Sequence, residues 1–151
     1  MHSITLRFLA SHTAPSASGR IYGGTVLRWM DEAGFACASA WAGGNCVTAL
    51  MGNASFDRPI HPGDLVEVQA SLAHTGETSM NMLIEVRSGG IQEKELREVT
   101  HCIAVYAALD EQGQPRAVDK FTPETPGDMA LAERVNVQVE AARLPAVPPA
   151  H

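Results

Sequence analysis

Residues 23–41 read GGTVLRWMDEAGFACASAW, and this stretch decides how the rest of the chain folds. Two glycines open it, two adjacent carboxylates lie near its middle, and almost every other position is small or apolar. The spacing predicts one long helix that is apolar nearly all round, which is typical of a buried helix. Because a buried charge is costly unless it is paired or hydrogen-bonded, the carboxylates in this helix need an explanation.

The two carboxylates, Asp31 and Glu32, lie on different sides of the predicted helix. At about 100° per residue, Glu32 shares its side with Arg28, and this i,i+4 ion pair accounts for its charge. Asp31 lies on the apolar face and has no partner in its own helix. It is either a structural Asp that bonds an amide or hydroxyl of a neighbouring strand, or a catalytic carboxylate. If one of the two carboxylates does chemistry, we expect it to be Asp31.

The glycine pair Gly23-Gly24 favours the interpretation that Asp31 is a catalytic carboxylate. A helix N-terminus presents unpaired N–H groups and the positive end of the helix dipole. Glycine also lets another group approach the backbone closely. A pair of glycines alone could be a simple turn, but here it predicts an oxyanion or phosphate site two helical turns before Asp31.

Composition restricts the classes of protein that the chain can belong to. Its 151 residues suit one domain, and its formal net charge of −6 argues against a sequence-independent nucleic-acid binder, which would carry a basic patch. We find no transmembrane run and no signal peptide, and we expect a cytoplasmic protein without a membrane or nucleic-acid partner. Cys37, Cys46 and Cys102 form no CxxC pair and are predicted to be reduced core residues. The six histidines show no HxxxH spacing, so we predict no metal.

The remaining chain alternates strand-like runs with short turns. Because these turns are too short to hold crossover helices, the sheet should be antiparallel. Strands are predicted at 4–10, 46–56, 65–74, 78–87 and 99–109, a loop at 11–19, and a helix stop at Ala42-Gly43-Gly44-Asn45.

The order of elements gives a single α+β domain. Residues 1–110 form this domain, and residues 111–151 form a linker, a short helix over 127–143 and a tail. The tail helix is expected to pack on the sheet or on a partner subunit. One sheet face cannot cover a helix that is apolar all round, so we expect the sheet to wrap around it and a second subunit to cover the rest.

Several motifs, in this order, resemble the hot-dog fold acyl-CoA thioesterases, and in particular the bacterial acyl-CoA hydrolases related to brain acyl-CoA hydrolase. The resemblance covers about residues 4–109. It rests on GRIYGG (19–24), WMDEA (29–33), VT (47–48), FDRPI (56–60), GDLV (63–66) and GETSM (76–80).

The resemblance implies an antiparallel sheet wrapped around one long central helix, and hydrolysis of an acyl-CoA to free CoA and a carboxylic acid. It also implies a homodimer joined edge to edge through its sheets, often assembled further into a hexamer or tetramer, with active sites at the dimer interface. Asp31 would be the general base or the nucleophile, two roles that the sequence does not separate. The N–H group of Gly24 would polarise the thioester carbonyl. CoA is part of the substrate, and no cofactor is implied.

Three further positions, Arg58, Thr78 and Ser79, match residues that hold CoA in this family, and the resemblance implies that they contact CoA here. Gly23 is also predicted to bind the substrate, and Phe35, Met51 and Met80 are candidates for an apolar acyl pocket. Plain core packing is the alternative for the three apolar residues, and a solvated loop charge is the alternative for Arg58. Ser79 has no GxSxG motif around it and is not expected to be a nucleophile, and His61 and His74 are expected at the surface.

One position departs from the family pattern. Ser16 stands where the family commonly has an Asn that orients the water or the carbonyl, and a hydroxyl lacks the fixed donor and acceptor of an amide. This departure keeps open a second class, an acyl-CoA-binding or sensing domain without turnover. A hydratase would need an Asp/His pair, and positions 32–41 contain no His.

Overall fold

The computed structural model describes residues 2–10, 16–52 and 54–143. The predicted loop over 11–19 therefore lies partly outside the described residues, and the predicted tail lies wholly outside them. The elements in chain order are β1 (Ser3–Leu9), α1 (Gly23–Ala42), β2 (Cys46–Met51), β3 (Leu65–Thr75), β4 (Ser79–Gly89), β5 (Arg97–Ala108) and α2 (Pro126–Arg143).

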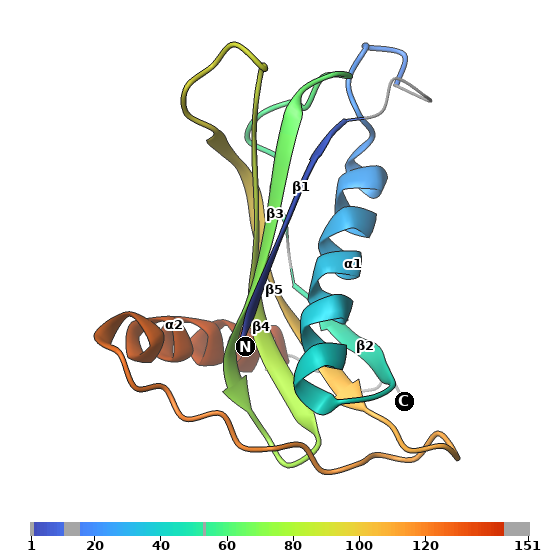
Figure 1. The fold of residues 1–151 in the computed structure, drawn as a ribbon, viewed down its shortest axis with the longest axis vertical. Helices are drawn as coiled ribbons and strands as arrows, with labels where there is room; N and C mark the ends of the chain where they lie inside the picture. Colours follow the sequence, from blue (N-terminus) through green and yellow to red (C-terminus); the bar gives the residue numbers. More distant parts are fainter. Residues whose placement is uncertain (1, 11–15, 53, 144–151) are drawn as a thin grey trace, which may run out of the picture.

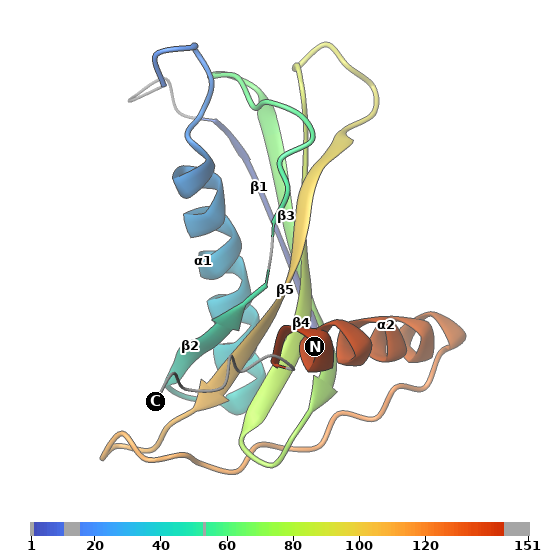
Figure 2. The same ribbon diagram turned by 180° about the vertical axis from the view of Figure 1, so that it is seen from behind.

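The strands form one five-stranded antiparallel sheet in the order β1-β3-β4-β5-β2. Helix α1 lies along one face of this sheet and contacts all five strands (Figure 1). Helix α2 lies across the strands on the opposite face, as the reverse view in Figure 2 shows. The antiparallel sheet around one long helix is confirmed, and β1 and β2 are its two edges.

Helix α1 begins and ends close to where the sequence predicts. Tyr22 precedes it in an extended conformation, and Gly43 ends it with φ of 68°, a left-handed conformation that suits glycine. The Gly43 N–H donates to the Ser39 carbonyl at 2.9 Å. The Arg116 guanidinium donates to the Ala42 carbonyl at 2.9 Å, and this places a cation at the negative end of the helix dipole.

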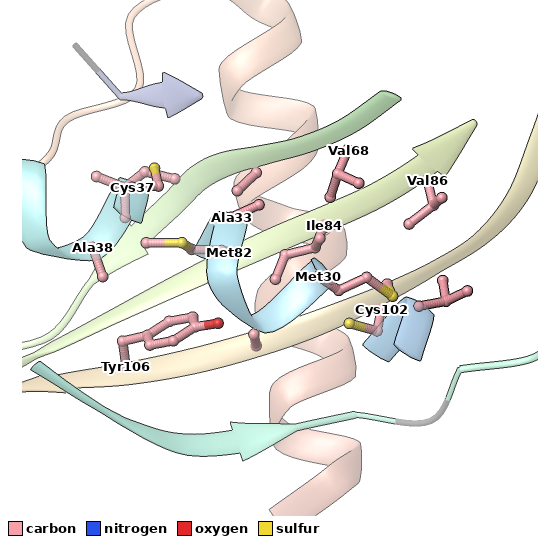
Figure 3. Packing of buried hydrophobic residues seen from close by; sticks show 14 of the residues in the cluster. Met30, Ala33, Cys37, Ala38, Val68, Met82, Ile84, Val86, Cys102 and Tyr106 are labelled. Carbon is pink, nitrogen blue, oxygen red and sulfur yellow. The ribbon is translucent and has the colours of Figure 1, made fainter. Parts of the chain in front are cut away.

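The main core lies between α1 and the sheet. The apolar residues on one side of α1 and those at alternate positions of the strands are buried against each other there. Figure 3 shows part of this cluster, which includes Met30, Ala33, Val68, Met82 and Ile84. Cys37, Cys46 and Cys102 are buried, so the prediction that they are core residues is confirmed.

Strand β2 is shorter than predicted. The expected strand over 46–56 ends at Met51, and 54–56 has no strand structure. Among the described residues of this segment, the last bond to β5 is from the Gly52 N–H to the Ile103 carbonyl, at 2.8 Å. Further along the chain, the Phe56 ring lies against Gly23 at the start of α1. The apolar character of Phe56 therefore serves this loop contact and not a strand.

Helix α2 covers a second, smaller core on the far face of the sheet. Val135 and Val139 of the helix are buried against Ala73, Ile103 and Val105 of the strands. Met129, near the start of α2, is exposed, so it is the middle and the end of the helix that pack on the sheet. Within the described residues, neither α1 nor α2 is long and apolar enough to cross a membrane.

Candidate active site

The Asp31 side chain is held by two hydroxyl groups from the sheet. Thr48 Oγ1 donates to Asp31 Oδ1 at 2.7 Å, and the Tyr106 hydroxyl donates to the same oxygen at 3.0 Å. Asp31 is half-buried, whereas the Tyr106 side chain is completely buried. A structural role alone would not require solvent to reach the carboxylate. Asp31 is thus both held firmly and accessible, which a reacting carboxylate requires.

Sheet register explains why these two hydroxyls meet. Thr48 on β2 lies directly opposite Tyr106 on β5, so both side chains are on the face that α1 covers. The register then shifts between Thr48 and Leu50, with Ala49 as the extra residue. Such bulges aim a side chain and often stand next to active sites.

The neighbours of Asp31 on β5 are uncharged at neutral pH. Burial, together with the negative charge of Asp31, raises the pKa of the Tyr106 hydroxyl well above its ordinary range. Burial, with a contribution from the same charge, raises the pKa of the Cys102 thiol to about 12. The Tyr106 hydroxyl therefore keeps its proton and remains a donor toward the carboxylate.

The start of α1 forms a second part of the candidate site. Tyr22 gives no side-chain cap, and the first turn contains no acidic residue. Among the described residues, no acceptor bonds the N–H groups of Gly23 and Gly24, and a methyl group added at Gly24 would meet nothing within 4 Å. This helix end therefore offers open donors to an anionic or polarised oxygen.

A cavity of about 320 Å³ lies beside this helix end. Its lining includes Ser16, Gly23 and Arg58, three of the residues that the sequence singles out, as well as Arg20 and Phe56. The loop that carries Arg58 is fixed at both sides: Asp57 N–H donates to the Val99 carbonyl at 3.1 Å, and the Ile60 carbonyl accepts from Ile21 N–H at 2.8 Å. Arg58 is exposed within this loop.

Ser16 is engaged in the turn that precedes α1. Its hydroxyl lies 2.9 Å from the Ser18 hydroxyl and accepts from the Arg20 N–H at 3.3 Å. Its backbone closes the same turn, in which Gly19 has φ of 78°. Ser16 thus lies near the helix start, and Asp31 is not among the residues that line its cavity.

Thr78 and Ser79 lie at the other end of the sheet from Arg58. Ser79 pairs with Ala107 on β5, whereas the Arg58 loop bonds to Val99 near the start of that strand. At about 3.3 Å per residue, these two points are roughly 26 Å apart along β5. One chain therefore does not bring Thr78 and Ser79 to the cavity that Arg58 lines.

The three residues predicted for an acyl pocket have different environments. Phe35 is 39% exposed and lies one helical turn after Asp31. Met51 is partly buried at the end of β2, and Met80 is completely buried on β4 opposite Tyr106. In a single chain, only Phe35 and Met51 can be reached by a ligand.

His61 and His74 are exposed, as predicted. In the described part of the chain, no group of three or more His, Cys, Asp or Glu side chains is placed to hold a metal ion.

Comparisons with known proteins identify the family. Residues 18–95 match the model of the thioesterase superfamily. This chain belongs to the thioesterase superfamily. A Buchnera aphidicola protein named an uncharacterized acyl-CoA thioester hydrolase is 33% identical over 76% of this chain and 87% of its own length. The acyl-CoA thioester hydrolase YciA of Escherichia coli is 32% identical over 76% and 89%.

The solved structures agree with the superfamily assignment. A crystal structure of an apo hexameric acyl-CoA thioesterase matches 93% of this chain and 90% of its own with a TM-score of 0.87 and 28% identity. The fold of this thioesterase-superfamily chain is accordingly the hot-dog fold, and the predicted α+β class is confirmed.

Two residues of the candidate thioesterase site escaped the sequence reasoning. Thr48 appeared only as part of a family motif, and Tyr106 lies in none of the motifs that carry the resemblance. The alternation of β5 places Tyr106 on the buried face with Ala104 and Cys102, but only the packing of α1 on the sheet brings it to Asp31. The one available signal for Tyr106 was its hydroxyl on an otherwise apolar strand face, because a buried Tyr hydroxyl usually has a hydrogen-bond partner.

Proposed function

We propose that this protein hydrolyses acyl-CoA thioesters to free CoA and a carboxylic acid, and that Asp31 is its catalytic carboxylate. The observation that carries the proposal is the half-buried Asp31 on an apolar helix, with Thr48 and Tyr106 both donating to its Oδ1. Among the described residues, no hydrogen bond ends on Oδ2. This oxygen is therefore the one we assign to the reaction.

The reaction adds the oxygen of water to the thioester carbonyl carbon and breaks the C–S bond. When Asp31 acts as a base, it takes a proton from the water and returns a proton to the departing thiolate of CoA. When it attacks directly, a mixed anhydride forms, and water then hydrolyses it. Both routes give the same products, and both need the ionised carboxylate.

Negative charge develops on the carbonyl oxygen during either route. The Gly24 N–H and the positive end of the α1 dipole are suited to stabilise it, because the helix end is open and uncapped. The nearby Arg58, which is exposed, is suited to meet a CoA phosphate, and Gly23 lines the same cavity.

We further propose that each active site combines groups from two subunits. Asp31 lies seven positions after Gly24, and at 1.5 Å per residue this is about 10 Å along the helix. An oxyanion donor and a base that act on one carbonyl must each lie about 3 Å from reacting atoms. Since one helix holds them too far apart, Asp31 of one subunit would work with Gly24 of its partner.

The β2 edge offers the surface for this pairing. Val47, Thr48 and Ala49 are exposed along it, and an unpaired strand edge readily pairs with another strand. Two such edges related by a two-fold axis would form one continuous sheet and give a homodimer. Since the similar solved structure is hexameric, we expect the dimers to assemble into a hexamer.

A two-subunit site also gives a role to the remaining predicted contacts. Thr78 and Ser79 would reach the CoA from the subunit that does not supply Arg58, because they lie at opposite ends of β5. Phe35 and Met51 would line the acyl pocket near the interface. Met80 is completely buried, so it would support the wall of this pocket as a core residue without contacting the ligand.

We expect the wild-type protein to release free thiol from at least one member of a panel of acyl-CoAs. The panel runs from acetyl-CoA to palmitoyl-CoA and includes an aryl-CoA, and a thiol-reactive dye reports the product. Binding of CoA esters by calorimetry without release from any member would contradict hydrolysis. That outcome would favour the acyl-CoA-binding or sensing alternative that the Ser16 departure keeps open.

A further inference from the structure

Tyr106 has the largest of the completely buried side chains, and its hydroxyl has all its described acceptors on one residue. These acceptors are Asp31 Oδ1 at 3.0 Å and the Asp31 carbonyl oxygen at 3.3 Å. A buried hydroxyl needs a partner, and a bond to a charged acceptor is the stronger kind. The hydroxyl thus couples the β5 core directly to the candidate catalytic carboxylate.

Helix α1 is shaped to admit this hydroxyl. A Cβ at Gly34 would lie 2.7 Å from Tyr106 Cζ and 2.8 Å from Ile84 Cδ1, and even closer to the Tyr106 hydroxyl oxygen. Glycine inside a helix costs about 0.5–1 kcal/mol relative to alanine, so its presence at position 34 needs a compensating gain. Figure 3 shows the Tyr106 hydroxyl directed at the helix, from a strand face packed with Met82 and Ile84.

We infer that Tyr106 is a positioning residue for the catalytic carboxylate, and that position 34 is glycine because the Tyr106 hydroxyl occupies the space of a side chain there. The core holds the Tyr106 ring in place, so the Tyr106 hydroxyl holds Asp31 Oδ1 in one position. Asp31 Oδ2 is then left free to react with the substrate. Thr48, opposite it on the exposed β2 edge, supplies the second donor. This inference rests on the proposed function, because it assigns a role within the same site.

The two donors that hold Asp31, the hydroxyls of Thr48 and Tyr106, are both uncharged at neutral pH. The buried thiols in this part of the core are also neutral, because burial raises the pKa of Cys37 to about 11 and that of Cys102 to about 12. Strand β2 faces the carboxylate with Thr48, which does not titrate, and β4 faces it with apolar side chains. On α1 itself, the nearest charges are Arg28 and Glu32, which pair with each other at 3.1 Å on the exposed side.

Replacing Tyr106 by Phe keeps the ring and removes the donor. We expect kcat at neutral pH to fall about 10- to 100-fold, as for loss of a hydrogen bond to a charged group, with KM within about threefold. The acidic limb of the pH–kcat profile should move upward, because the variant lacks the hydroxyl that donates to Asp31 Oδ1. Gly34→Ala, which displaces the same hydroxyl, should move the limb in the same direction.

Ile84→Val is the matched packing control, because Ile84 borders the same space at Gly34 and makes no bond to Asp31. It should lower stability by about 0.5–1.5 kcal/mol and leave the pH profile in place. A kcat loss in Tyr106→Phe without a shift of the acidic limb, or an equal shift in Ile84→Val, would overturn the positioning role.

A measurement without substrate separates this inference from the proposed function. The carboxyl carbon of Asp31 can be titrated by 13C NMR in the wild type and in Tyr106→Phe, with Asp31→Asn to assign the signal. A higher titration midpoint in Tyr106→Phe supports the inference even in a protein that releases no thiol. An unchanged midpoint overturns it even in an active enzyme.

Discussion

Asp31→Asn is expected to lower kcat for acyl-CoA hydrolysis roughly 10³-fold, because an amide of the same shape can neither accept the proton of water nor attack the carbonyl. The substitution keeps the size of the side chain and can still accept from Thr48 and Tyr106 through its carbonyl oxygen. Stability and substrate binding should therefore change little. Steady-state thiol release and calorimetric binding of a CoA ester measure the two effects separately.

Glu32→Gln is the control for this experiment. Glu32 is the adjacent carboxylate on α1, but it is exposed and pairs with Arg28 across one helical turn. Loss of such a surface pair changes stability by at most about 1 kcal/mol. Equal losses of activity in Glu32→Gln and Asp31→Asn would contradict the assignment of the chemistry to Asp31.

Gly24→Pro is expected to lower kcat about 10²- to 10³-fold, the usual cost of removing one oxyanion donor. Proline lacks the N–H, and the first turn of a helix accepts it because that N–H makes no helical bond there. The loss should fall on kcat more than on KM, since the bond strengthens as charge develops on the oxygen. Rates with the best substrate of the panel provide the measurement.

Gly24→Ala separates the N–H from the small size of glycine. It keeps the donor, and its added methyl group meets nothing within 4 Å in one subunit. We expect a loss of less than about tenfold, in contrast to the proline variant. Similar losses in both variants would mean that close approach to Gly24, and not its N–H, is what the site requires.

The framework of this fold could be predicted because its signals are local. Neighbouring residues alone indicate the apolar helix, the glycine that ends it and the alternating strands. The predicted bounds of α1 agree with the structure to within one residue. The 46–56 strand was too long because Phe56 is apolar for another reason, its contact with Gly23. Hydrophobic pattern alone does not distinguish a strand from a loop that folds back onto a helix end.

The partners of Asp31 could not be predicted from pattern alone. The sequence favoured Asp31 over Glu32 by helical geometry and allowed for a hydroxyl on a neighbouring strand, but Tyr106 lies 75 residues away. Its contact with Asp31 depends on how α1 packs on β5, and the strand order and the β2–β5 register then place Thr48 beside it. The distance between Gly24 and Asp31 along α1, in contrast, follows from the helix rise alone. This distance is the reason for proposing an active site shared by two subunits.

Mixing two inactive variants tests the shared active site most directly. Asp31→Asn and Gly24→Pro subunits are co-expressed, purified together and assayed for thiol release beside each variant alone. In a mixed dimer, one site carries both substitutions and the other carries neither, so random pairing should restore about a quarter of the wild-type activity. If Asp31 and Gly24 of the same subunit act together, every site carries one substitution. The mixture would then remain as inactive as its components, and the account of a site built by two subunits would be contradicted.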